Sequence, residues 1–72
     1  MTNEKFMIEE ISKEIVLLLI DEYHLDIRDA LRLLYTSDTY SKLTNLKSGL
    51  YTQSTPYIYE FLEQELTTGK LS

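Results

Sequence analysis

Few residues in this chain could carry out chemistry. The chain has one histidine, His24, and no cysteine. A catalytic nucleophile needs a base beside it, and that base needs a third group to orient it, so a single imidazole does not make an active site. Glu22 precedes His24 by two residues, which is not the three- or four-residue spacing of metal ligands on a helix. We therefore expect no enzyme activity, cofactor or metal site, and a structural or surface role for His24.

Tyrosine is the unusual component of the sequence. There are six tyrosines, with no tryptophan and two phenylalanines. A tyrosine carries an apolar ring and a hydroxyl that prefers water, which suits the edge of a core or an interface. One interpretation places these residues at the core edge of a small bundle. The other is a protein-binding surface centred on Tyr51, Tyr57 and Tyr59.

Residues 27–46 have the pattern of a helix-turn-helix, in which the second helix would enter the major groove of DNA. Ala30 lies in the first helix, and Ser37 is placed to cap the second. Against this, Tyr35 stands where the turn often carries glycine, and Asp38 would repel phosphate. The expected DNA contacts are Arg28, Arg32, Thr39, Ser41 and Lys42. DNA-binding regulation is therefore the alternative function, and nucleic acid is not the partner that we favour.

A long helix around the apolar run at residues 15–20 is expected to position these residues. Advancing 100° per residue from Ile8 gathers a broad apolar face, which comprises Ile8, Ile11, Ile15, Leu18 and Leu19. The run is flanked by Glu14 and Asp21 and is far shorter than the ~20 residues of a membrane span. It also follows no basic segment of the kind found in signal peptides. We expect a buried helix and no membrane association.

Local signals divide the rest of the chain. Asp26 is placed to cap a second helix, Gly49 suits a left-handed helix end, and Pro56 favours the first turn of a last helix. The inward residues are expected to be Ile27, Ala30, Leu31, Leu34, Tyr40, Leu43, Leu46, Ile58, Phe61, Leu62 and Leu66. The sequence thus predicts one all-α domain over residues 1–72. It is a bundle of three main helices, at about 3–24, 27–36 and 55–68, plus one short helix at about 38–46.

Length and charge limit the possible functions. A chain of 72 residues buries a modest core and is marginal by itself, and the lack of cysteine removes disulfides as a stabiliser. The net charge is −5, which disfavours nonspecific binding to nucleic acid or anionic membranes. Only residues 26–50 carry a positive balance, +1. A cysteine-free, acidic domain fits the cytoplasm.

Leu17 breaks the pattern of the long helix, because it lies on the polar side. Phe6 lies near the same angle three turns earlier. A two-fold homodimer would bury both, since an isologous contact needs only one self-complementary patch. A second protein encoded nearby is the other possible partner, and the alternative to any interface is that Leu17 is a lone exposed apolar residue. The function that we expect is a protein–protein interaction or regulatory module that self-associates.

The second half of the sequence resembles a family of very short, uncharacterised bacterial all-α proteins that end in a Gly-Leu-Tyr, Gln-Ser, Tyr-x-Tyr pattern. The matching residues are Asp29-Ala30-Leu31, Leu34-Tyr35, Ser37, Tyr40, Lys42-Leu43, Gly49-Leu50-Tyr51, Gln53-Ser54, Tyr57, Tyr59-Glu60 and Leu62. The family usually has threonine before the glycine, where this chain has Ser48. The resemblance implies a bacterial cytoplasmic helical domain of unknown function and assigns no site.

Overall fold

The computed structural model describes residues 3–68, and every regular element in that range is helical. The elements are α1 (Asn3–Tyr23), α2 (Ile27–Tyr35), α3 (Asp38–Thr44) and α4 (Thr55–Thr68), with two short 3₁₀ turns, η1 (Leu46–Ser48) and η2 (Leu50–Thr52), between α3 and α4. The all-α class is confirmed for this part of the chain. Among the described residues, no helix is long and apolar enough to cross a membrane.

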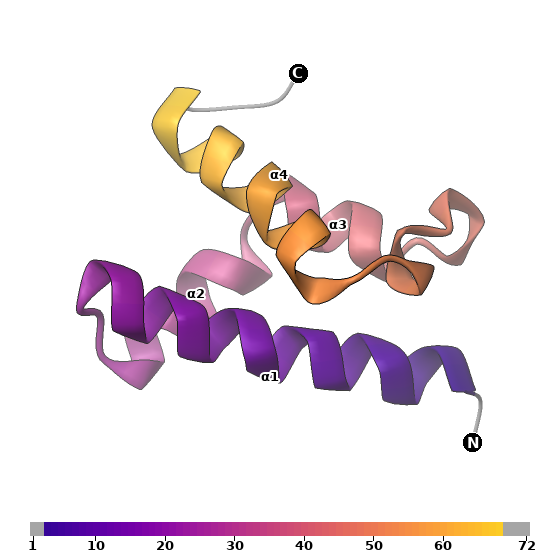
Figure 1. Ribbon diagram of the computed structural model, residues 1–72, viewed down its shortest axis with the longest axis horizontal. Helices are drawn as coiled ribbons and strands as arrows, with labels where there is room; N and C mark the ends of the chain where they lie inside the picture. The colour runs from indigo at the N-terminus through magenta and orange to yellow at the C-terminus, as the bar shows by residue number, and fades with distance from the viewer. Residues whose placement is uncertain (1–2, 69–72) are drawn as a thin grey trace.

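The four helices surround one small core. Figure 1 shows α1 along one side of the molecule, α4 across from it, and α2 and α3 behind them. α1 contacts α2, η2 and α4, while α3 packs against α4. The residues with no exposed surface come from all four helices, and they are Ile15, Leu19, Ala30, Leu34, Leu43, Ile58 and Leu62. Ile15, Val16 and Leu19 from the apolar run of α1 therefore lie in the core, whereas Leu17 and Leu18 of the same run are exposed.

The predicted helix boundaries follow the local signals. The Asp26 side chain accepts a hydrogen bond from the backbone N–H of Asp29 at 2.8 Å, and the Ser37 hydroxyl accepts one from Tyr40 at 3.0 Å. Gly49 has φ of 70° and ψ of 6°, which is the left-handed conformation expected of it. These three predictions rest on neighbouring residues, and all three are confirmed.

The predicted short helix at 38–46 is too long. α3 ends at Thr44 because Asn45 takes an extended conformation and uses its side-chain oxygen to accept from the N–H of Lys47 at 3.1 Å. Asparagine favours such local side-chain bonds over helix continuation. Leu46 falls in η1 and is 53% exposed, so its expected place in the core is wrong.

Two more inward residues are corrected by the packing. Ile27 is 63% exposed because it is the first residue of α2 and lies beyond the edge of the core. Ala30 and Leu34 are the residues of α2 that pack in the core. Leu18 is 37% exposed, and the buried face of α1 instead includes Val16 and Ser12. The buried face of α1 is therefore turned about the helix axis, towards α2, relative to the buried face that the sequence predicts.

Candidate interaction surface

A groove of about 500 Å³ lies between α1 and α2, with its end closed by α3. We name it the α1–α2 groove; its apolar lining comprises Ile8, Val16 and Leu17 from α1, Ile27, Leu31 and Tyr35 from α2, and Tyr40 from α3. Glu9 and Lys13 supply charge at its α1 side. Such a groove, apolar inside with a few polar groups at the rim, is typical of a site that takes an apolar side chain or a helix.

The walls of the α1–α2 groove are open to solvent. Leu17 is 65% exposed, Ile27 63% and Tyr35 54%. One exposed leucine is ordinary on a protein surface, whereas three large apolar side chains around one groove form a patch. The structure thus brings residues from positions 17, 27 and 35 together, and the sequence analysis had singled out only Leu17 among them as interface.

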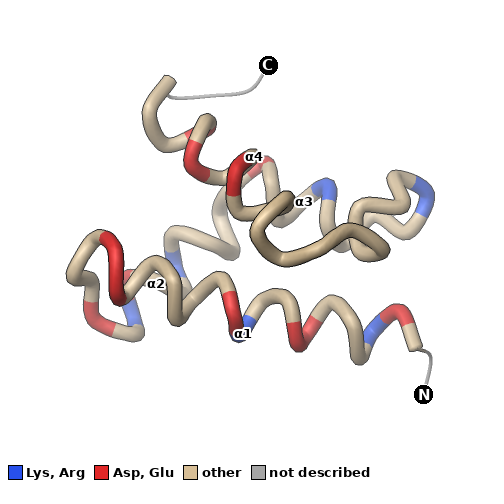
Figure 2. The backbone as a smooth tube through the Cα atoms, viewed as in Figure 1, with Lys and Arg blue, Asp and Glu red and all other residues tan. Residues whose placement is uncertain are grey.

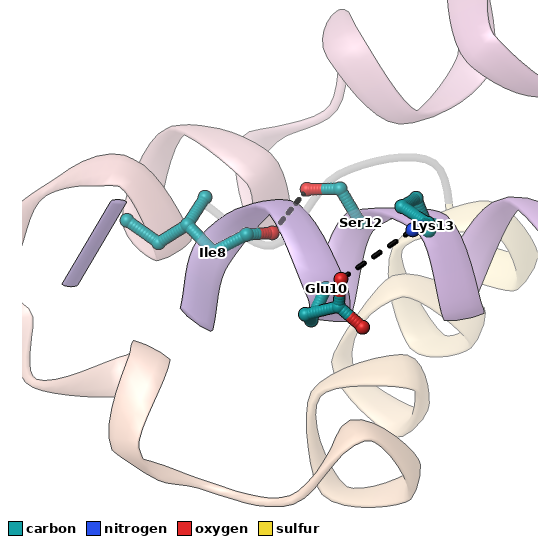
Figure 3. Close-up of polar contacts among 4 residues, drawn as sticks. All are labelled: Ile8, Glu10, Ser12 and Lys13. Carbon is teal, nitrogen blue, oxygen red and sulfur yellow. Dashed lines mark hydrogen bonds and ion pairs between the residues drawn. The ribbon is translucent and has the colours of Figure 1, made fainter. Parts of the chain in front are cut away.

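The buried polar atoms that line the groove have hydrogen-bond partners within the protein. Ser12 is buried, and its hydroxyl donates to the carbonyl of Ile8 one turn earlier at 2.7 Å (Figure 3). The rings of Tyr35 and Tyr40 lie 5.0 Å apart in a tilted arrangement at the α3 end. Burial, with smaller contributions from Tyr35 and Glu9, raises the pKa of Tyr40. Among the described residues, no buried side-chain oxygen or nitrogen lacks a hydrogen-bond partner, so the groove offers mainly apolar contact.

The other predicted interface residues do not line this groove. Phe6 is 55% exposed on α1. Tyr57 is 48% exposed and meets Phe61 edge to face at 5.1 Å, and Tyr51 is half-buried against the core. Tyr59 is only 6% exposed, so its expected place on an interface is corrected.

Tyr59 is buried because it joins α4 to the end of α1. Its hydroxyl donates to Glu22 at 2.9 Å. Burial and this hydrogen bond raise the pKa of Tyr59. Glu63, one turn along α4, lies beside Glu22. Hydrogen bonding between the two carboxyls when one is protonated, burial, and repulsion from Glu22 and Glu60 raise the pKa of Glu63. Two acidic helices thus meet where α1 ends.

The predicted DNA-reading residues divide into two groups. Arg28, Arg32, Ser41 and Lys42 are exposed. Thr39 is 1% exposed and donates its hydroxyl to Glu65, so its role as a DNA contact is corrected. α3 has seven residues, about two turns, which is short for a helix that must lie in a groove and present several side chains. This arrangement gives DNA reading less support than the apolar surface of α1 and α2.

Glu65 is a buried residue to which the sequence pattern assigned no role. It is 8% exposed, and its two oxygens accept from the backbone N–H groups of Asp38 and Thr39 at 2.8 and 3.0 Å. A carboxylate at the start of a helix satisfies free N–H groups and complements the helix dipole. Its burial could have been predicted from its position on the buried stripe of α4, because it follows Ile58 by seven residues and Leu62 by three.

His24 lies in the chain reversal between α1 and α2. It is exposed and has φ of 57°, so it ends α1 in the left-handed conformation more usual for glycine. Within residues 3–68, no three His, Asp or Glu side chains lie close enough to hold a metal ion.

Comparisons with protein-family models, curated proteins and solved structures find no match for this chain. The resemblance to short bacterial proteins therefore stays a prediction.

Proposed function

We propose that this chain is a small protein–protein interaction module that self-associates through the exposed side of α1 and the adjoining α1–α2 groove. The observation that carries the proposal is the clustering of Leu17, Ile27 and Tyr35, each more than half exposed, around one apolar groove. Exposed apolar patches bordered by polar residues are a feature of interaction sites.

A second copy of the chain is the occupant that best fits the size of the protein. The chain buries a small core and carries neither disulfide nor cysteine, and association is a usual means of stabilising so short a domain. A standard interface hides about 800 Å² on each partner, which is about a sixth of the 5054 Å² surface of this chain. One exposed side of α1 with its groove supplies the apolar part of that area.

Sedimentation of the wild type and Leu17→Glu at micromolar concentration tests this function. We expect the wild type to run above its monomer mass of 8.5 kDa, and Leu17→Glu to run as a monomer, because a buried unpaired carboxylate is costly. Leu46→Glu is the matched control, since Leu46 is similarly exposed at 53% and does not line the α1–α2 groove. A wild type that stays monomeric, with the stability of Leu17→Glu, would overturn the proposal.

A further inference from the structure

The outer side of α1 carries four residues in a heptad-like order. Phe6, Glu10, Lys13 and Leu17 follow one another at spacings of four, three and four, which places them in one line along a helix. We call them the outer stripe of α1. It has an apolar residue at each end and an acid and a base between them. Phe6 is 55% exposed and Leu17 65%, so both ends of the stripe lie open on the surface.

The charged pair in the middle of the outer stripe is also open to solvent. The Lys13 amine lies 3.4 Å from a Glu10 carboxylate oxygen (Figure 3), and the two side chains are 73% and 46% exposed. An exposed pair of this kind contributes little to folding, because water competes for both charges. Both groups thus stay accessible to an opposite charge on another molecule.

The outer stripe is complementary to itself when reversed. In an antiparallel two-fold pair of helices, each residue faces the residue at the mirrored position of the other helix. With the axis midway between Glu10 and Lys13, Phe6 faces Leu17 and Glu10 faces Lys13. This two-fold rotation therefore places an apolar residue against an apolar residue, or an acid against a base, at all four positions. A parallel pairing would instead put like charges together.

We propose that two copies of the chain associate through an antiparallel contact between their α1 helices, in which Phe6 packs on Leu17 and Glu10 pairs with Lys13 of the other copy. The inference rests on the proposed function and names its partner and register. Because Leu17 is also a wall of the α1–α2 groove, a phenylalanine ring placed over it covers the groove rim. The contact thereby joins the outer stripe to the groove.

Charge reversal tests the register. Glu10→Lys alone places Lys against Lys, and Lys13→Glu alone places Glu against Glu, so each variant should self-associate about tenfold more weakly. An equal mixture of the two variants restores both opposite-charge pairs between copies, while the contacts within each helix stay repulsive. The mixed dimer should recover to within about threefold of the wild-type dissociation constant. Rescue in the mixture can therefore arise only between molecules.

Lys47→Glu and Glu60→Lys are the matched controls, since they make the same charge changes on η1 and α4. We expect both to self-associate as the wild type does. Single reversals without effect, or a mixture that stays weak, would overturn the antiparallel register while leaving self-association in place. A monomeric wild type would instead overturn the proposed function itself, so the two failures are distinguishable.

Cysteine cross-linking reports the register directly, because the chain has no cysteine of its own. On oxidation, a mixture of Phe6→Cys and Leu17→Cys should give mainly the mixed disulfide, since only mirrored positions approach closely enough. A dominant bond between two copies of Leu17→Cys would indicate either parallel helices or an antiparallel pair with its two-fold axis at Leu17, and both would overturn the inference.

Discussion

At the scale of single residues, two backbone conformations shape this protein. Gly49 and His24 are the residues of the described chain with φ between 50° and 80°, at 70° and 57°. Glycine occupies this region without strain, whereas a side chain with a Cβ does not. The glycine therefore suits its place between η1 and η2, and the histidine is held in its conformation by the turn from α1 to α2.

Gly49→Ala should destabilise the fold by about 1 kcal/mol. An added Cβ would meet no atom within 4 Å, so the cost comes from φ and not from a clash. His24→Gly should have the opposite sign and stabilise by roughly 0.5 kcal/mol, because it relieves the same strain. Urea unfolding of both variants measures the two free energies. A neutral Gly49→Ala would show that its φ is not constrained by the fold.

At the scale of elements, the start of α3 depends on a side chain from α4. The N–H groups of Asp38 and Thr39 donate to Glu65, and that of Tyr40 donates to Ser37. The first turn of α3 is therefore satisfied jointly by a local cap and by a carboxylate 26 residues away from Thr39. A seven-residue helix would be marginal without these partners.

Glu65→Ala should destabilise the protein by about 2 kcal/mol, since it leaves buried donors of α3 without acceptors. Glu65→Gln should cost less, because one side-chain oxygen remains. A double-mutant cycle with Thr39→Val should be non-additive, because the two residues share a hydrogen bond of 2.9 Å. Glu60→Ala, on the same helix and exposed, is the control and should change unfolding little. Additive effects would mean that the two side chains act independently.

At the scale of the whole molecule, charge is divided between the helices. Acidic residues are spread along α1 and α4, whereas the described basic residues after α1 lie on α2, α3 and η1 (Figure 2). The two acidic helices meet where Glu22 accepts a hydrogen bond from the Tyr59 hydroxyl and lies beside Glu63. Folding therefore brings two carboxyl groups together, and its free energy must depend on pH.

The raised pKa of Glu63 sets the sign of that dependence. A carboxyl whose pKa is higher in the folded than in the unfolded state stabilises the fold below its ordinary value of 4.5, and this stabilisation is lost as pH rises through the higher, folded pKa. Glu63→Gln should therefore match the wild type in acid and become the more stable protein as pH rises above 4.5. Urea unfolding at a series of pH values measures the difference. A difference in stability between Glu63→Gln and the wild type that shrinks towards neutral pH would contradict the assignment.

The local sequence determined much of this protein. The all-α class, the central helix, the starts of α2, α3 and α4, and the left-handed residue after η1 follow from periodicity and from residues such as Asp26, Ser37, Pro56 and Gly49. Each of these acts on backbone groups within a few positions of itself, so neighbouring residues suffice to predict it. The exposure of Leu17 was predictable for the same reason, because a residue on the polar side of a regular helix faces water.

The tertiary structure decided which distant residues meet. Whether Tyr59 faces solvent depends on Glu22, 37 positions earlier, and the burial of Thr39 depends on Glu65. Ile27 and Tyr35 join Leu17 only because α2 folds back along α1. Helical periodicity indicates which side of a helix is apolar. It does not indicate which other helix packs against that side, or how much of it the other helix buries. The groove is the part of α1 and α2 that α3 and α4 leave uncovered.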